Sequence, residues 1–472
     1  LNITATGAGA TLNVNGVTGG GNITGTTTLS SLESTITFLN NASTFNNSLA
    51  LVANNVDVTV ALGVTGSISF TGNSGVDVFL GESGSGLNLT NAELARLTAS
   101  GGMNVTATGA GSSMTVNGVT SGGTIIGTTT LSSDVDGVTF ATTESTFNNA
   151  LDVVGLTTIA GVNITTTSDS ITFSGQVSLT TAGVSINTVS GDITFADALN
   201  GSQALTLTAG AGLVSFVGFV GDSATLASLT VVSAGDISIG NAMKVTGEIS
   251  ITGNSGVDIF LGTTGAGLSL TDAEIDFITE AGSLAITATG AGASITVNDV
   301  TGGGVVSGVT TLASNADGVF FMTTASTFNN SLAVVADDVA IDAALGVTGI
   351  ISFTGNSGVN VIVGTGGVST NLILSNAELD LLTASGGLNI TATGAGATLN
   401  VNGVTGGGNI TGTTTLSSLE STITFLNNAS TFNNSLALVA NNVDVTVALG
   451  VTGSISFTGN SGVNVIVGTG GV

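Results

Sequence analysis

The feature that most constrains the fold of this 472-residue chain is an internal repeat. The string TATGAG occurs four times, at steps of 102, 181 and 104 residues; its copies begin at Thr4, Thr106, Thr287 and Thr391. The string STFNN follows with the same three steps, beginning at Ser43, Ser145, Ser326 and Ser430. Repetition at fixed steps is typical of solenoids, in which each unit contacts only its neighbours. We expect repeat units at 4–105, 106–286 and 287–390, and a partial one at 391–472.

Two stretches of the chain are identical. Residues 1–76 recur unchanged as residues 388–463. Tandem duplication within one gene is the simplest origin of such identity. We therefore expect this chain to be a piece of a longer polypeptide that continues into further units of the same kind.

A shorter period of about 20 residues, which is within the range of solenoid coils, lies inside the repeat. It is clearest in an extra segment that the second repeat unit carries within 150–251. This segment makes the step of 181 residues longer than the step of 102 residues by 79. There Ile171-Thr-Phe, Ile193-Thr-Phe, Val214-Ser-Phe and Ile237-Ser-Ile follow one another at steps of 22, 21 and 23. We expect these pairs to stack as one buried ladder. At this period the 102-residue repeat would be about five coils, the extra segment about four whole coils, and the chain about 23 coils.

Each coil has the pattern of short β-strands. Val56, Val58 and Val60 alternate with Asp57 and Thr59, and such alternation indicates one buried and one solvated face. The strands are separated by turns rich in Gly, of which the chain has 72, whereas Pro, which cannot donate to a β-ladder, is absent. The sequence predicts an all-β fold, one continuous parallel β-helix (β-solenoid) over residues 1–472. The crossover rule predicts that it is right-handed.

Composition excludes several classes of function. The chain has no Cys and no His, which removes disulfides, thiolate chemistry and the commonest general base. Arg96 and Lys244 are its only basic residues against 29 Asp and Glu, and the net charge of −27 repels nucleic acid and anionic membranes. No apolar run reaches the ~18 residues of a membrane span. We predict no nucleic-acid partner and no membrane insertion of this segment.

The titratable residues suggest no active site. Arg96 and Lys244 stand alone, and the acids are spread along the chain without the clustering that hydrolases need. The one adjacent acidic pair, Asp337-Asp338, is predicted to lie in a solvated turn. We therefore predict that the protein is not an enzyme and has no catalytic, cofactor-binding or metal-ligating residues. The calcium-binding GGxGxD nonapeptide is absent, so we expect at most weak, non-specific screening of the charge by Ca²⁺.

Thr-x-Thr steps occur at four places, and in solenoids regular Thr columns can bind ice. The four steps are Thr4/Thr6, Thr106/Thr108, Thr206/Thr208 and Thr287/Thr289. Because they return mostly once per repeat and not once per coil, a carbohydrate-binding or ice-binding solenoid is only a minor alternative.

A longer phrase carries a family resemblance. It has the form L-x-L-[ST]-[ND]-A-E-[LI]-x-x-[LI]-T and begins at Leu87, Leu268 and Leu372. The phrase resembles the repeats of giant filamentous-haemagglutinin-like exoproteins, bacterial surface fibres secreted by two-partner or autotransporter-like routes. The resemblance implies a right-handed β-helix, export, and an extracellular or cell-surface fibre that is often adhesive. It assigns no functional residue, because the phrase is structural in that family.

Together these features predict a non-enzymatic structural or adhesive fibre. Its partners would be further coils of the same polypeptide or identical chains, and the surface of a host or neighbouring cell. The alternative is a subunit of an extracellular filament or sheath in which such solenoids pack laterally or end to end.

Overall fold

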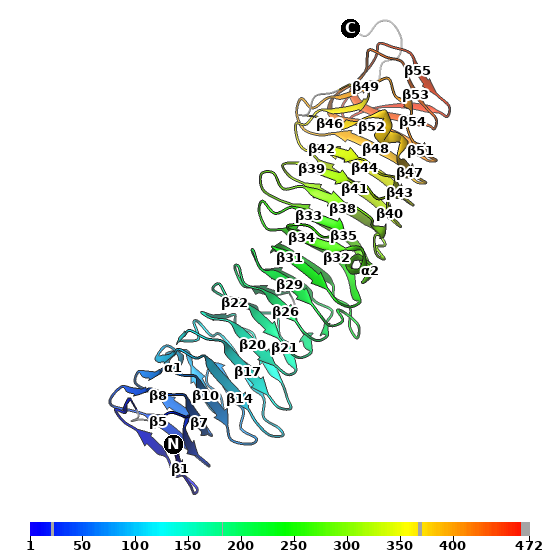
Figure 1. Cartoon of the computed structure of the whole chain (residues 1–472). Coiled ribbons are helices and arrows are strands. Elements are labelled where there is room, and N and C mark those ends of the chain that lie inside the picture. Colours follow the sequence, from blue (N-terminus) through cyan, green and yellow to red (C-terminus); the bar gives the residue numbers. More distant parts are fainter. Residues whose placement is uncertain (20–22, 182, 367–370, 464–472) are drawn as a thin grey trace. The chain divides into compact units, whose positions relative to one another are not determined.

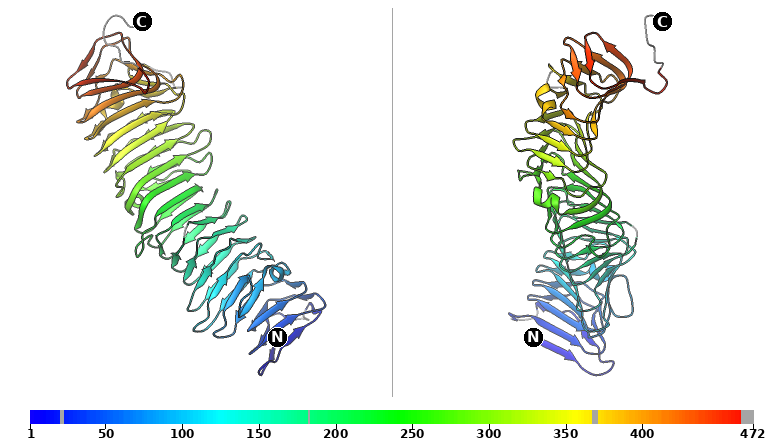
Figure 2. Two further views of the ribbon diagram at one scale, coloured as in Figure 1. Left: turned by 180° about the vertical axis from the view of Figure 1, so that it is seen from behind. Right: turned by 90° about the vertical axis from the view of Figure 1, so that its right-hand side faces the viewer.

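A computed structural model describes residues 1–472 except 20–22, 182, 367–370 and 464–472 (Figure 1). The fold is all-β, with 54% of residues in strands and 3% in helices. Parallel strands are stacked coil upon coil, and the two further views in Figure 2 show the same stacking. This confirms the predicted β-solenoid. It has about 20 turns, fewer than the 23 expected.

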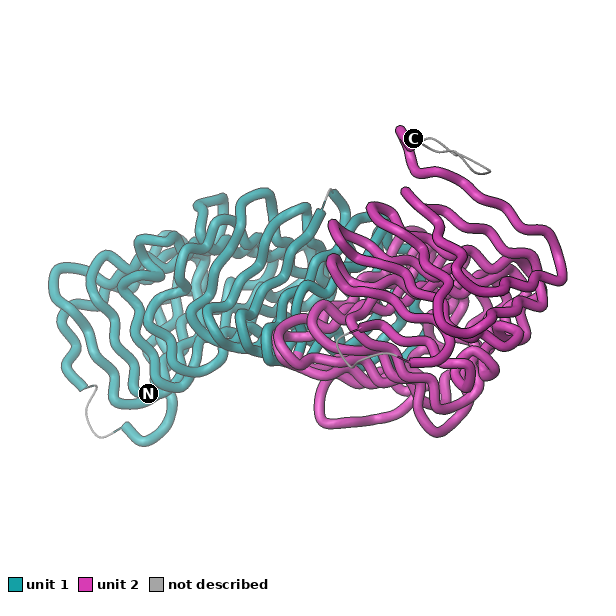
Figure 3. The backbone as a smooth tube through the Cα atoms, turned by 90° about the horizontal axis from the view of Figure 1, so that it is seen from above, with its two compact units in different colours: residues 1–234, 238–244 teal, residues 235–237, 245–472 magenta. Residues whose placement is uncertain are grey.

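The chain forms two compact units, shown in teal and magenta in Figure 3. Unit 1 comprises residues 1–234 and 238–244, and unit 2 comprises residues 235–237 and 245–472. Strands β31 (Asp236–Ile239) and β32 (Met243–Gly253) contain residues of both units. The expectation of one continuous solenoid over residues 1–472 stays a prediction.

In unit 1, successive strands fall on three stacks, which we call walls A, B and C. Wall A consists of β1 (Asn2–Ala5), β4 (Thr27–Ser31), β7 (Leu49–Ala53), β10 (Ile68–Gly72), β14 (Met103–Ala107), β17 (Thr129–Ser133), β20 (Leu151–Val154), β23 (Ile171–Phe173), β26 (Ile193–Phe195) and β29 (Leu213–Phe216). Wall B consists of β2 (Leu12–Val14), β5 (Thr35–Phe38), β8 (Asn55–Val58), β12 (Leu87–Thr90), β11 (Val78–Gly81), β15 (Met114–Val116), β18 (Val138–Phe140), β21 (Thr157–Ile159), β24 (Val177–Leu179) and β27 (Leu199–Asn200). Wall C consists of β3 (Thr18–Gly19), β6 (Ser43–Phe45), β9 (Leu62–Val64), β13 (Leu97–Ala99), β16 (Thr124–Ile125), β19 (Ser145–Phe147), β22 (Asn163–Thr166), β25 (Val184–Asn187), β28 (Ala204–Thr208) and β30 (Ser228–Ala234).

The core of unit 1 is built from the alternating apolar residues. Ile171, Ile193 and Val214 stand in register on β23, β26 and β29, and the Phe two positions later on each strand is buried. The rings of Phe173, Phe195 and Phe216 stack with centroids 5.3 and 5.5 Å apart. These three pairs form the predicted ladder. Ile237 and Ile239, expected just beyond, are both buried on β31.

The 102-residue repeat is four coils, not the expected five. Along wall A the paired residues advance by 26, 22, 19 and 35 positions, as in Asn2↔Thr28, Thr27↔Leu49, Leu49↔Ile68 and Ile68↔Met103. The longest coil contains the phrase at Leu87. In it β11 is followed by β12, which folds back beside β11 with Val78 opposite Leu87 and thus adds a rung to wall B alone.

A short helical turn, α1 (Asn91–Leu94), follows that extra rung. Thr90 caps it and Glu93 completes a capping box, with Glu93 Oε2 accepting from the backbone N of Thr90 at 2.9 Å. The T-x-x-E spacing within the phrase is the sequence signature of this box. The same box recurs at α2 (Asp272–Asp276) and α3 (Asn376–Asp380).

The extra segment of the second repeat does not contain a whole number of coils, contrary to expectation. Met243 is the repeat equivalent of Leu62, which lies on wall C. Met243 instead forms a parallel bridge with Val220, which bridges Leu199 on wall B. Residues that are equivalent in the repeat therefore lie on neighbouring walls, and not on the same wall, before and after the segment. Strands here are added one by one, because each needs only the rung before it.

Unit 2 repeats the arrangement. Its first wall contains β35 (Ile278–Ala288), β38 (Val309–Ser314), β41 (Ser331–Ala336), β44 (Ile350–Gly355), β48 (Gly387–Ala392) and β56 (Ile455–Gly459), with the first halves of β52 (Thr413–Phe425) and β54 (Leu436–Val445). Its second wall contains β34 (Leu268–Thr271), β33 (Ile259–Gly262), β36 (Ile295–Val297), β39 (Gly318–Phe321), β42 (Asp338–Ile341), β46 (Leu372–Leu374), β45 (Val361–Gly364) and β49 (Leu399–Asn402). Its third wall contains β37 (Thr301–Gly302), β40 (Ser326–Phe328), β43 (Leu345–Val347), β47 (Leu382–Ala384), β51 (Asn409–Ile410), β50 (Thr405–Gly406), β53 (Ser430–Phe432) and β55 (Leu449–Val451).

Candidate functional site

The polar residues that recur in every repeat hold one coil to another. The serine of each STFNN string accepts a hydrogen bond from the backbone N–H of a valine 26 residues earlier, at 3.1–3.2 Å. The serines are Ser43, Ser145, Ser326 and Ser430, and all are buried. Because the valine precedes the serine by one coil, each bond links neighbouring rungs.

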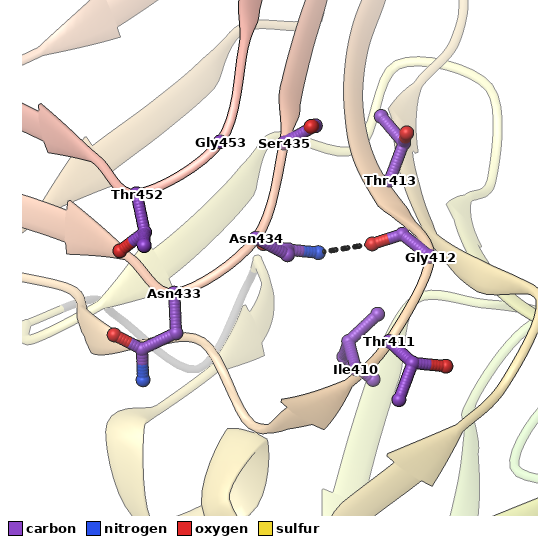
Figure 4. Close-up of a pocket in the computed structure, with 9 residues that line it drawn as sticks. All are labelled: Ile410, Thr411, Gly412, Thr413, Asn433, Asn434, Ser435, Thr452 and Gly453. Carbon is purple, nitrogen blue, oxygen red and sulfur yellow. Dashed lines mark hydrogen bonds between the residues drawn. The ribbon is translucent and has the colours of Figure 1, made fainter.

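The second asparagine of STFNN makes a further link, shown in Figure 4 for the fourth repeat. Asn434 Nδ2 donates to the carbonyl oxygen of Gly412 at 2.6 Å and to Oγ1 of Thr414 at 2.8 Å. Asn47, Asn149 and Asn330 bind the equivalent glycine and threonine. The hollow around Asn434 is lined by small and uncharged residues, and so it offers no acid, base or cation to a ligand.

The other two repeated strings also link coils. Asn73 of TGNSG donates to the carbonyl oxygens of Ser31 and Leu32, both at 2.9 Å, and Asn460 makes the equivalent bonds in unit 2. Thr108, which ends a Thr-x-Thr step, donates to the carbonyl of Gly72 at 2.8 Å. Thr108 is therefore tied to a neighbouring coil. Sequence reasoning did not assign these roles, although the identity of the strings in four copies was the available signal.

The only Arg of the chain lies at a polar groove between β8 and β12. Arg96 Nη1 donates to the carbonyl of Val58 at 2.8 Å, and Oε1 of Glu93 accepts from the backbone N–H of Val58 at 3.2 Å. Oδ1 of Asn55 accepts from the backbone N–H of Asn88 at 2.9 Å. Among the described residues no backbone pairing joins these two rungs, and side chains bridge them instead.

The other basic residue is paired on the surface. Lys244 Nζ lies 3.1 Å from Oδ1 of Asp222; the side chain of Lys244 is partly exposed and that of Asp222 is exposed. An exposed ion pair of this kind contributes little stability. Arg96 and Lys244 lie in different settings and form no joint site.

The acidic pair Asp337-Asp338 is half-buried and hydrogen-bonded, not fully solvated as expected. Oδ1 of Asp337 accepts from Nδ2 of Asn356 at 2.7 Å. Burial raises the pKa of Asp338 above its ordinary value of 3.8, and the carboxylates of Glu378 and Asp317 raise it further. A hydrogen bond from the backbone N–H of Val339 opposes this rise. The pair has structural partners and faces no basic group.

No arrangement typical of an active site is found in the described part of the chain. Its His, Cys, Asp and Glu residues form no group of three that could hold a metal ion, and none of its helices is long and apolar enough to cross a membrane. Comparison with known proteins found no match among family models, curated proteins or solved structures.

Proposed function

We propose that this chain is a segment of a non-enzymatic, extracellular structural or adhesive fibre. The observation that carries the proposal is the use made of its repeated polar residues. In each of four copies the Ser and second Asn of STFNN bind the preceding coil. Among the residues that the structure describes, the acids form no group of three that could hold a metal ion. Repetition of a linking residue, and not of a reactive one, is what a structural solenoid requires.

The net charge of −27 also fits a surface exposed to solvent outside the cell, where it keeps neighbouring fibres apart. The phrases at Leu87, Leu268 and Leu372 support export through their resemblance to bacterial surface fibres. Adhesion would then be to host or neighbouring cells, with further coils or identical chains as structural partners.

Immunogold labelling of intact cells tests this proposal. Antibodies raised against the folded chain should label the outer surface of unpermeabilised cells of the source organism, on material that extends away from the envelope. Labelling that appears only after permeabilisation would refute the extracellular assignment.

A second candidate is a subunit of a filament or sheath. Outward residues in the first wall of unit 2 favour it, because they are small and uncharged on strand after strand, as in Thr311↔Ala333 and Ala333↔Ser352. Flat faces of this kind can stack. Electron microscopy of native material distinguishes the two: isolated thin fibres support the first function, and a regular array of parallel solenoids supports the second.

A further inference from the structure

We infer that the side-chain-bridged seam between β8 and β12 is a joint at which wall B of unit 1 opens locally while walls A and C stay closed. We call this place the seam; it comprises the facing rungs Asn55–Val58 and Leu87–Thr90. The inference depends on the solenoid fold alone and goes beyond the proposed function.

The seam is confined to one of the three walls. Across the same coils wall A is backbone-paired without a break, with Ile68 in register with Leu49 on one side and Met103 on the other. Wall C is likewise paired, with Leu62 between Ser43 and Leu97. Only wall B changes from a backbone ladder to side-chain bridges.

An additional rung in wall B causes the break. Wall B has the rungs β8, β12, β11 and β15 where wall A has only β7, β10 and β14. Because adjacent rungs in a ladder lie about 4.8 Å apart, one additional rung makes wall B longer than wall A. This mismatch in length falls between β8 and β12, where no backbone pairs are described. Side chains, which reach farther than backbone groups, span the junction instead.

Side chains hold the two rungs of the seam together. The described bridges across it are Asn55 Oδ1 to the backbone N–H and to the side-chain amide of Asn88, Glu93 to the N–H of Val58, and Arg96 to the carbonyl of Val58. Rotation of three side chains therefore releases these peptide groups, whereas opening a backbone ladder requires moving a strand. Regions with few backbone bonds and a solvated edge open at the lowest free energy. Inside the seam the buried Val56, Val58, Leu87 and Leu89 limit how far it opens.

Unit 2 has a related seam between β42 and β46, with a weaker set of bridges. Glu378 again accepts from the backbone N–H of its partner strand, at Ile341 and 3.2 Å. Leu381 replaces Arg96, and Asp338 replaces Asn55 and is bonded to its own strand at Val339. The two seams therefore provide a comparison within one molecule.

Hydrogen exchange of the intact wild-type chain, followed by mass spectrometry with residue-level fragmentation, tests the inference. We expect the amides of Val58 and Asn88 to exchange at least tenfold faster than the wall A amides of Phe70 and Val105. Equal protection at all four amides would overturn the inference.

Variants separate the bridges from general destabilisation. Asn55→Ala should speed amide exchange at Asn88 about tenfold and leave exchange at Phe70 unchanged. Arg96→Leu introduces the residue type of the second seam, and it should speed amide exchange at Val58 by a smaller factor. Asn91→Ala is the matched control, because it removes the side-chain bonds to Gly118 and Thr120 on the other side of the same turn but none of the bridges across the seam. Equal acceleration on walls A and B in Asn55→Ala, or equal effects of Asn91→Ala and Arg96→Leu at Val58, would contradict a local joint. The wild-type exchange pattern decides the matter if a variant does not fold.

Discussion

At the scale of single residues, two adjacent asparagines in STFNN have opposite environments. In the second repeat Asn148 is exposed, whereas Asn149 is 3% exposed and binds the carbonyl of Gly127 and Oγ1 of Thr129. The composition of the string does not distinguish the two. Their environments differ because successive residues of an extended segment point to opposite sides.

Replacing Asn149 should therefore be costly. Asn149→Ala leaves a part-buried carbonyl and a buried hydroxyl without their partner, and the loss of a partner for a buried group costs about 1–3 kcal/mol. We expect the free energy of unfolding, measured by urea denaturation, to fall by that amount, whereas Asn148→Ala should change it little. Equal effects of the two substitutions would show that the inter-coil bond is not the source of stability.

Asp338 makes the stability of unit 2 depend on pH. Its pKa is raised in the folded chain by burial and by nearby carboxylates, and so folding favours its protonated form. Its contribution is then fully present below the ordinary value of 3.8 and is lost as the pH rises through the higher folded value. The wild-type chain should therefore lose stability over this range.

Asp338→Asn removes that titration and restores the residue type of Asn55 in the first repeat. The variant should be more stable than wild type at neutral pH, and its advantage should shrink to nothing below the ordinary carboxyl pKa. Thermal melts at several pH values measure this, with Asp380→Asn as an exposed control. An advantage that does not change with pH would contradict the role of the charge.

At the scale of strands and coils, alternation was sufficient to predict the core. Ile171 and Phe173 point inward because they are the apolar members of a period-two pattern, and the coil period places Ile193 and Phe195 directly over them. The alternation within each strand and the stacking between coils therefore bury the same residues. This is why the fold class could be predicted from the sequence.

The number of coils per repeat could not be predicted, because β12 has the same alternation as any other strand. Leu87 and Leu89 are fully buried like the apolar residues of other rungs, yet β12 returns beside β11 and does not advance to the next wall. The direction of a strand after a turn is set by tertiary pairing. The bridges from Asn55 and Glu93 were missed for the same reason, since 33 and 35 residues separate them from their partners.

The Phe ladder should be a major source of stability. Phe195 is stacked on both sides, by Phe173 and Phe216, and is 1% exposed. Phe195→Ala should lower the free energy of unfolding by about 3–5 kcal/mol, because it leaves a cavity in a well-packed core. Thr194→Ala, which changes the outward neighbour, should cost much less. Similar values for both in urea denaturation would mean that the core collapses around the cavity.

Whole coils should be removable. Deleting residues 171–192 brings Ile193 into the register that Ile171 has against Leu151, and so the walls can close again. Deleting only residues 171–181 shifts the following strands to other walls. A change of wall is accommodated in the extra segment because its own strands match the rungs before them, whereas the second deletion removes two strands and leaves no such match. We expect the first deletion to keep the far-UV circular dichroism and cooperative melt of the wild-type chain, and the second to melt at a lower temperature. Loss of folding in both would show that these coils are not interchangeable.

At the scale of the whole molecule, charge should govern association. The faces of the walls are built largely from small polar residues that can stack, whereas a net charge of −27 makes identical chains repel one another at neutral pH. Attraction between faces is short-ranged, and repulsion between charges is screened within about 8 Å at physiological ionic strength. Salt and acid should therefore both promote association.

Light scattering should detect separate chains at pH 7 in low salt, and assemblies as salt is added or as the pH approaches the isoelectric point near 4.1. Controls at the same ionic strength but with sulfate in place of chloride separate screening from salting-out. Assemblies that form at pH 7 in low salt and do not grow with added salt would contradict this account, and would indicate contacts strong enough to overcome unscreened charge.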